Sequence, residues 1–216
     1  QEKYYEAISE GKIRPILLRS SGNIVFPDGK SFKDIVKKKR GGLVITKEYQ
    51  NMFKEKNLLN HSIKFYNMIK HLKSNSCEGI VFIYSFFLDY GVNSLAIAMD
   101  EAGFTQKKID ESGNIIETNL LKSPSYKEGP NKNFSYVLLT DNDDNKLDRL
   151  KDLINSPKNK NGEIVKVILG TDRISTGHSF RNCREVHILD PWYNLSKLEQ
   201  TVGRAVRNSS HIDLPQ

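Results

Sequence analysis

The last quarter of the chain, residues 165–211, contains two short apolar runs that each lead into a polar loop. The runs cover residues 165–169 and 186–189. Apolar runs of this length are typical of strands that are buried in a parallel sheet. In an open α/β fold, the loops after such strands lie at the carboxyl edge of the sheet, where ligands bind. We therefore expect the functional residues of this chain at that edge.

A helix is predicted over residues 196–207, after the second loop. Gln200, Gly203, Arg204 and Arg207 stand three or four positions apart in it, so that they are expected to share one helical face. An arginine pair on a surface helix is usually solvated charge. Here the neighbouring glycine and the two flanking loops favour a ligand-facing role instead.

These residues resemble conserved motifs of superfamily 2 helicases and translocases. The four residues of the predicted helix resemble motif VI, and residues 170–177, GTDRISTG, resemble motif V. Residues 189–194, LDPWYN, are similar to the segment between these motifs in the Swi/Snf-type branch. The ending RNSSH resembles the helicase-like ATPases of large cytoplasmic DNA viruses, a group that includes poxvirus early transcription factor. The resemblance covers about residues 60–211.

Beside the two terminal runs, strands are predicted at residues 79–85 and 134–140. Helices are predicted from residue 61, with Ile63 on the apolar face, at 87–103, and at 146–155 after an acidic entry at 141–144. This order of strands and helices indicates an α/β fold with a central parallel sheet, and the resemblance implies a three-layer RecA-like domain. Residues 61–216 are expected to form this helicase C-terminal lobe. Residues 1–60 are expected to be an irregular lead-in or linker from a preceding region, with short strands at 13–18, 23–26 and 41–45. Residues 105–133 have a low apolar content and are expected to form an exposed insertion or a mobile loop.

Composition places the chain among ordinary globular proteins, with 38% hydrophobic and 27% charged residues. No run approaches eighteen apolar residues, so no membrane span is expected. The net charge of +7 is concentrated in the first 75 residues, which alone carry +9. The densest part, residues 37–40, is either a solvated face or a contact to a phosphate backbone. The start at Gln1 has neither an initiator Met nor a signal sequence and suggests a fragment of a longer chain.

Cys77 and Cys183 stand 106 positions apart, and no cysteine or histidine pair has the spacing of a zinc site. The five histidines are not expected to form a ligand cluster. These observations predict no metal site in this chain and a reduced, intracellular compartment. Gly29-Lys30-Ser31 imitates the end of a phosphate-binding loop, but position 24 is Ile where that loop requires Gly.

The resemblance implies that Arg204 and Arg207 face the phosphates of ATP, with Arg207 as the first choice for an arginine finger. Arginine suits this role because its planar fork stays protonated and reaches two oxygens at once. Gln200, Gly203, Gly177 and Asp172 are expected near the nucleotide. Ser179 stands where the family often has an acidic residue for the ribose, which leaves the ribose contact open.

The resemblance implies that Thr171, in motif V, lies at the nucleic-acid backbone, where a hydroxyl can donate to a phosphate oxygen without reading a base. Residues 79–103 resemble motif IV, which implies a place near the phosphates for Ser85; the alternative is a strand-to-helix turn without a ligand. Trp192 could stack on bases or pack against its own strand. ATP and Mg²⁺ are the implied cofactors. The chain has neither a phosphate-binding loop nor an Asp-Glu pair after an apolar strand, so Mg²⁺ should be held mainly by another lobe.

The chain is therefore interpreted as the C-terminal motor lobe of an ATP-dependent nucleic-acid helicase or translocase. It would supply arginine fingers and backbone contacts to an N-terminal RecA-like lobe of the same parent chain, and it should be inactive alone. The expected partners are DNA or RNA and the transcription machinery, in the host cytoplasm or the virion. The alternative is a catalytically inactive, helicase-like binding module of a transcription complex.

Overall fold

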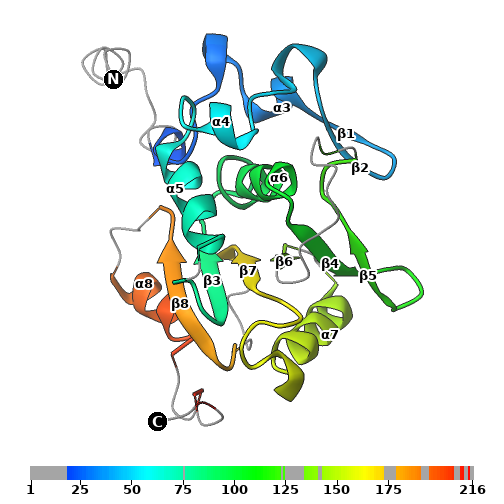
Figure 1. The fold of residues 1–216 in the computed structure, drawn as a ribbon, viewed down its shortest axis with the longest axis vertical. Coiled ribbons are helices and arrows are strands. Elements are labelled where there is room, and N and C mark those ends of the chain that lie inside the picture. Colours follow the sequence, from blue (N-terminus) through cyan, green and yellow to red (C-terminus); the bar gives the residue numbers. More distant parts are fainter. Residues whose placement is uncertain are drawn as a thin grey trace.

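The computed structural model describes residues 19–74, 76–122, 124, 134–140, 143–172, 179–190, 195–206, 210, 211 and 214. Six strands form one sheet in the order β5-β4-β6-β7-β3-β8 (Figure 1). They are β3 (Ile80–Tyr84), β4 (Thr105–Ile109), β5 (Ile115–Thr118), β6 (Ser135–Leu139), β7 (Val167–Gly170) and β8 (Cys183–Ile188). All neighbouring pairs are parallel except β4 and β5, which confirms the predicted parallel sheet and adds one antiparallel edge strand.

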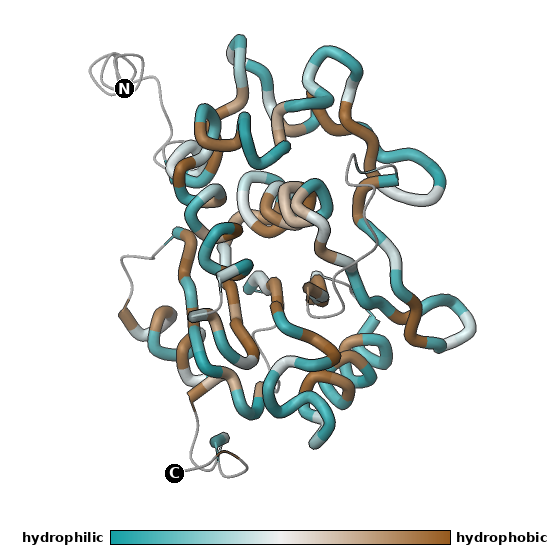
Figure 2. The backbone as a smooth tube through the Cα atoms, viewed as in Figure 1, coloured by the Kyte–Doolittle hydropathy of each residue, from teal (hydrophilic) through white to brown (hydrophobic). Residues whose placement is uncertain are grey.

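Helices cover both faces of the sheet, so the domain has three layers. The helices are α5 (Ile63–Leu72), the π-helix η3 (Leu88–Asn93), which continues into α6 (Ser94–Glu101), and α7 (Asp144–Ile154) and α8 (Leu195–Val202). Side chains alternate along β3: Val81 and Ile83 enter the core shared with α5 and α6, whereas Phe82 enters the core shared with α7. Figure 2 shows hydrophobic residues along the central strands and α6, with hydrophilic residues predominant in the peripheral loops. None of the helices in the described ranges combines the length and apolar character needed to cross a membrane.

Side-chain caps explain where two of the helices begin. The Ser62 hydroxyl accepts a hydrogen bond from the Phe65 N–H at 3.0 Å at the start of α5. The Asp143 carboxylate accepts from the Asn145 and Lys146 N–H groups at the start of α7, as the acidic entry to this helix predicts. The helices expected after residues 61, 87 and 146 are thus confirmed, although Ile63 is 65% exposed instead of buried.

The described part of the expected lead-in is folded and packs on the α5–α6 layer. It comprises η1 (Pro27–Gly29), α3 (Phe32–Ile35), β1 (Val36–Lys39), β2 (Gly42–Ile45), η2 (Lys47–Tyr49) and α4 (Glu55–Leu58). Ile24, Phe32 and Phe53 are buried in the same core as α5 and α6. The strand expected at 41–45 is confirmed as β2, the strand expected at 23–26 is wrong, and residues 13–18 lie outside the described residues. A domain boundary at residue 60 remains a prediction.

The expected exposed loop at 105–133 is wrong for its first part, which forms the β4–β5 hairpin. β4 extends the parallel sheet through β6, and its polar sequence reflects its place near the sheet edge. Beyond β5, the Leu43 N–H donates to the Leu120 carbonyl at 2.8 Å and the Lys122 N–H donates to the Leu43 carbonyl at 2.9 Å. Gly42 permits this approach, because a Cβ there would lie 2.9 Å from the Leu120 oxygen. Most of residues 123–133 lie outside the described residues.

Asp100 connects the end of α6 to the strands beside it and is 1% exposed. Its carboxylate accepts hydrogen bonds from the Leu121 N–H at 2.7 Å, the Tyr136 hydroxyl at 2.8 Å and the Asn119 amide at 3.1 Å. Burial raises the pKa of Asp100 to about 7, against the lowering effect of these hydrogen bonds.

The pH dependence of stability should show this raised pKa. Between about pH 4 and 7, Asp100 is deprotonated in the unfolded chain and protonated in the folded one, so its contribution to stability falls as the pH rises. The loss is on the order of 4 kcal/mol by pH 7. We expect the difference in unfolding free energy between the wild type and Asp100→Asn to shrink steadily over this range in urea titrations. A pH-independent difference would contradict the assignment.

Candidate functional site

Three parallel strands end side by side at the carboxyl edge of the sheet, as the sequence predicts. Ser85 follows β3, Thr171 and Asp172 follow β7, and Asp190 lies two residues beyond β8. The Ser85 N–H donates to the Gly170 carbonyl at 3.0 Å, which joins the first two of these ends. Thr171 is 7% exposed and Asp172 is partly exposed. The predicted motif V residues that the structure describes therefore lie at the ligand edge of the fold.

Asp172 is oriented by a tyrosine on the neighbouring strand. The Tyr84 hydroxyl donates a hydrogen bond to the Asp172 carboxylate. Burial, followed by this hydrogen bond and the negative charge of Asp172, raises the pKa of Tyr84, and the positive charge of Arg204 partly offsets the effect. Tyr84 therefore stays a proton donor at neutral pH, and Arg204 lies close enough to act on it electrostatically.

Ser85 is fully buried, and its hydroxyl donates to the Asp190 carboxylate at 2.5 Å. The Phe86 N–H donates to the second Asp190 oxygen at 2.8 Å. Gly91 leaves the necessary space, since a Cβ there would lie 1.9 Å from the Ser85 hydroxyl. In this arrangement the Ser85 hydroxyl does not reach the surface. The predicted phosphate contact of this side chain is therefore not supported, because the hydroxyl already donates its hydrogen bond to Asp190.

Asp190 also joins the amino-terminal segment to this edge, a role that sequence reasoning missed. The Asn23 amide donates to the Asp190 carboxylate at 2.9 Å, and Arg19 donates to the Asp190 carbonyl at 3.3 Å. The Lys64 ammonium donates to the Leu189 carbonyl at 2.5 Å and to the Asn23 amide oxygen at 2.8 Å. Burial raises the pKa of Asp190, while the bonds from Ser85, Asn23 and the Phe86 N–H lower it. The only sequence signal was the position of Asp190 within the LDPWYN segment.

The helix predicted over residues 196–207 is shorter in the structure, where α8 ends at Val202. A turn continues it, because the Gly203 N–H donates to the Glu199 carbonyl at 2.8 Å. Gln200 is exposed, whereas Arg204 is only 8% exposed. The helix ends between these two residues, and a common face of the motif VI residues stays a prediction. Arg207 lies outside the described residues.

The turn around Arg204 lies beside the segment that follows motif V. The Phe180 N–H donates to the Arg204 carbonyl at 2.8 Å, and the Asn182 N–H donates to the Ser210 carbonyl at 2.8 Å. Asn155, at the end of α7, donates to the Ser179 carbonyl at 3.0 Å and accepts from the Arg181 N–H at 2.8 Å. Ser179 is partly exposed within this segment. Gly177, Trp192 and Tyr193 lie outside the described residues.

Comparison with known proteins agrees with this arrangement. Residues 127–209 match the family model described as the helicase conserved C-terminal domain. The chain contains a superfamily 2 helicase C-terminal lobe. A putative ATP-dependent RNA helicase of Acanthamoeba polyphaga mimivirus is 31% identical over 154 residues, which cover 71% of this chain and 24% of the relative.

Other relatives of the lobe also come from large DNA viruses. A putative helicase of Invertebrate iridescent virus 3 is 29% identical over 91% of this chain and 19% of its own length. A homolog of the termination factor NPH-I from African swine fever virus is 28% identical over 79% of this chain and 26% of its own length. The chain thus spans about a quarter or less of these relatives. The expected resemblance to helicases of large DNA viruses is confirmed.

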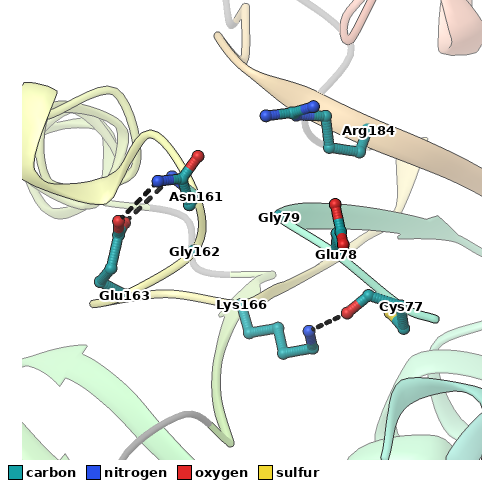
Figure 3. A pocket seen from close by; sticks show the side chains of 8 residues that line it. All are labelled: Cys77, Glu78, Gly79, Asn161, Gly162, Glu163, Lys166 and Arg184. Atoms are coloured by element: carbon teal, nitrogen blue, oxygen red, sulfur yellow. Dashed lines mark hydrogen bonds between the residues drawn. The ribbon is translucent and has the colours of Figure 1, made fainter. Parts of the chain in front are cut away.

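A pocket of about 300 Å³ lies at the opposite, amino-terminal edge of the helicase lobe's sheet. Figure 3 shows its lining, which comprises Cys77, Glu78, Gly79, Asn161, Gly162, Glu163, Lys166 and Arg184. Gly79 directly precedes β3 and Lys166 directly precedes β7, whereas the motif residues follow the other ends of these strands. The pocket is therefore separate from the candidate site.

Among the described residues, one group of side chains could hold a metal ion, although the sequence predicts no ligand cluster. His71, Cys77 and Glu185 place a nitrogen, a sulfur and an oxygen within 4.8 Å of one another. His187 adds a second imidazole, with its Nε2 2.7 Å from a Glu185 oxygen. Sequence spacing could not show this cluster, because its members come from α5, the following turn and β8.

Proposed function

We propose that this lobe is the C-terminal motor lobe of a nucleic-acid-dependent ATPase that works as a helicase or translocase. The observation that carries the proposal is the position of Arg204, which is buried beside the carboxyl edge and held next to the segment after motif V. An N-terminal RecA-like lobe of the same parent chain would hold ATP against this edge. Binding and hydrolysis would then close and open the two lobes.

The residues present fit part of an ATP site. Arg204 and Arg207 would neutralise charge on the transferring phosphoryl group, while Gln200, which is exposed, would contact the nucleotide from the surface. Gly203, Gly177 and Ser179 would line the approach of the nucleotide. Asp172 already accepts a hydrogen bond from Tyr84 and would hold the motif V loop. Mg²⁺ would be held mainly by the N-terminal lobe, because it is bound through carboxylates and substrate phosphates together.

Nucleic acid would bind through its backbone at the end of β7, with Thr171 as a donor to a phosphate oxygen. The names of the relatives, an RNA helicase and a termination factor homolog, support RNA or DNA as the ligand and a link to transcription. A viral protein of this kind would work in the host cytoplasm or in the virion.

The direct test is ATP hydrolysis by the full parent protein, with and without single-stranded DNA, duplex DNA and RNA. We expect turnover that at least one nucleic acid stimulates, and no hydrolysis by the 216-residue lobe alone. An intact parent protein that binds nucleic acid without any turnover would favour a catalytically inactive binding module instead.

Thr171→Val should weaken this stimulation while leaving basal turnover unchanged. Loss of one hydrogen bond to a charged phosphate corresponds to roughly a tenfold rise in the nucleic-acid concentration that gives half-maximal stimulation. Thr171→Ser keeps the hydroxyl and serves as the matched control, expected to behave like the wild type. Normal stimulation of the Thr171→Val variant would mean that the hydroxyl binds no phosphate.

A further inference from the structure

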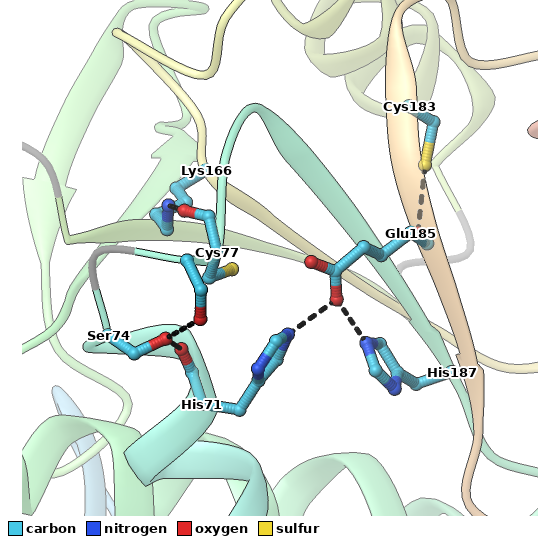
Figure 4. A network of polar contacts seen from close by, with 8 residues as sticks. His71, Ser74, Cys77, Lys166, Cys183, Glu185 and His187 are labelled. Carbon is cyan, nitrogen blue, oxygen red and sulfur yellow. Dashed lines mark hydrogen bonds and ion pairs between the residues drawn. The ribbon is translucent and has the colours of Figure 1, made fainter.

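The carboxyl end of α5 and the first half of β8 bring together three side chains of metal-ligand type (Figure 4). His71 lies in the last turn of α5, Cys77 in the turn before β3, and Glu185 on β8. Their ligand atoms lie within 4.8 Å of one another, and the His71 Nε2 is 2.6 Å from a Glu185 oxygen. Figure 4 shows the Cys77 sulfur directed toward the Glu185 carboxylate.

We propose that His71, Cys77 and Glu185 bind a zinc-class transition metal ion. Nitrogen, sulfur and oxygen donors together are typical of Zn²⁺ sites, whereas Mg²⁺ and Ca²⁺ take oxygen donors. Around a tetrahedral Zn²⁺ the ligand atoms are about 3.3–3.8 Å apart. The cluster therefore needs only a small adjustment, in which the ion replaces the proton between His71 and Glu185.

The charges and hydrogen bonds of the cluster suit a divalent ion. One thiolate and one carboxylate cancel a charge of +2, with His71 neutral. The His187 Nε2 donates to the same Glu185 oxygen at 2.7 Å, because an ionised carboxylate only accepts, and His187 is thus a positioning residue for this ligand. The side chains of His71, Glu185 and His187 are 37%, 24% and 31% exposed, which leaves an entry path and a fourth position for water.

The backbones that carry the ligands are already held in place. The Ser74 hydroxyl donates to the His71 carbonyl at 2.6 Å, and the Lys166 ammonium donates to the Cys77 carbonyl at 2.6 Å. Glu185 lies in the parallel pairing of β3 with β8. Metal binding would therefore lose little conformational entropy, and the ion would cross-link edge strand β8 to helix α5. A plain hydrogen-bonded group of His71, Glu185 and His187 would need no contribution from Cys77, which separates the two explanations.

The test uses the reduced, metal-free parent protein titrated with Co²⁺ and then with Zn²⁺. We expect Co²⁺ to produce a thiolate-to-cobalt charge-transfer band, Zn²⁺ to remove that band by displacement, and excess Mg²⁺ to leave it unchanged. Saturating Zn²⁺ should also raise the Tm of the lobe by several degrees, because the ion binds the folded site. Absence of the band from the wild type would overturn the proposal.

Matched variants identify the ligands. The Cys77→Ser and Cys77→Ala variants should each bind one equivalent of Co²⁺ fewer than the wild type. Each should also lose the part of the charge-transfer band that belongs to this site. Glu185→Gln, which keeps the shape of the side chain, should lower Co²⁺ affinity at least tenfold, and His187→Asn should lower it about tenfold while keeping the band. Cys183→Ala controls for the other buried thiol and should keep the band. A band that keeps its full wild-type intensity in both Cys77 variants, or one that is lost in Cys183→Ala, would contradict the assignment.

Discussion

Arg207→Ala in the parent protein is expected to lower nucleic-acid-stimulated ATP turnover by two or more decades, with little change in the Kd for ATP. An arginine finger acts on charge that develops during phosphoryl transfer, so its removal lowers kcat more than it weakens ground-state binding. In GTPases such a residue contributes about three to five decades in rate. Steady-state turnover and equilibrium ATP binding, measured on the same preparations, check this prediction.

Arg204→Ala should lower ATP turnover by a comparable factor, but a second substitution is needed because Arg204 is buried. Arg204 is 8% exposed, so truncation to Ala removes packing as well as charge. Arg204→Lys keeps the charge without the planar fork, and we expect it to lower kcat more than tenfold with a nearly unchanged Tm. Arg184→Ala is the control: Arg184 is exposed at the opposite sheet edge and its removal should leave turnover normal. Turnover that is indifferent to both Arg204→Lys and Arg207→Ala would contradict the proposed motor.

Asp190→Ala is expected to lower the free energy of unfolding by about 3–5 kcal/mol. Its carboxylate accepts from the Ser85 hydroxyl, the Phe86 N–H and the Asn23 amide, and Ser85 and Asn23 are buried. Truncation would leave the Phe86 N–H and the Asn23 amide without this acceptor, and the Ser85 hydroxyl with only the Phe87 carbonyl at 3.1 Å. Urea unfolding of the lobe measures the loss, with an unchanged m-value as the sign that the unfolded state is the same.

Two further substitutions make the Asp190 prediction specific. Asp190→Asn keeps the shape but turns one acceptor oxygen into a donor that faces another donor, so an intermediate loss is expected. Asp148→Ala removes an acidic group whose side chain is 65% exposed and which pairs with the Lys151 ammonium at 3.7 Å. Its effect should stay within about 0.5 kcal/mol. Equal losses for Asp190→Ala and Asp148→Ala would mean that the Asp190 network contributes nothing.

The central strands β3 and β7 could be predicted because each is a compact apolar run that is buried on both faces. β3 and β7 are fully buried, and their boundaries fall within two residues of the predicted ones. β4 and β5 were not predicted, because strands near a sheet edge carry polar side chains, such as Lys107 and Lys108, that hide the apolar strand pattern. The packing of residues 24–58 on α5 and α6 was not predicted either, because the apolar residues of this segment are spread over several short elements.

The sequence by itself determined the local structure and the motif positions, because helix and strand periods, caps and motif spacings are carried by neighbouring residues. The tertiary structure alone decided which distant side chains meet. β3 lies between β7 and β8, so Ser85 meets Asp190 across 105 positions and His71 meets Glu185 across 114. Such contacts depend on strand order and register, which no local pattern encodes. For this reason the buried Ser85 hydroxyl and the His71–Cys77–Glu185 cluster became visible only in the folded chain.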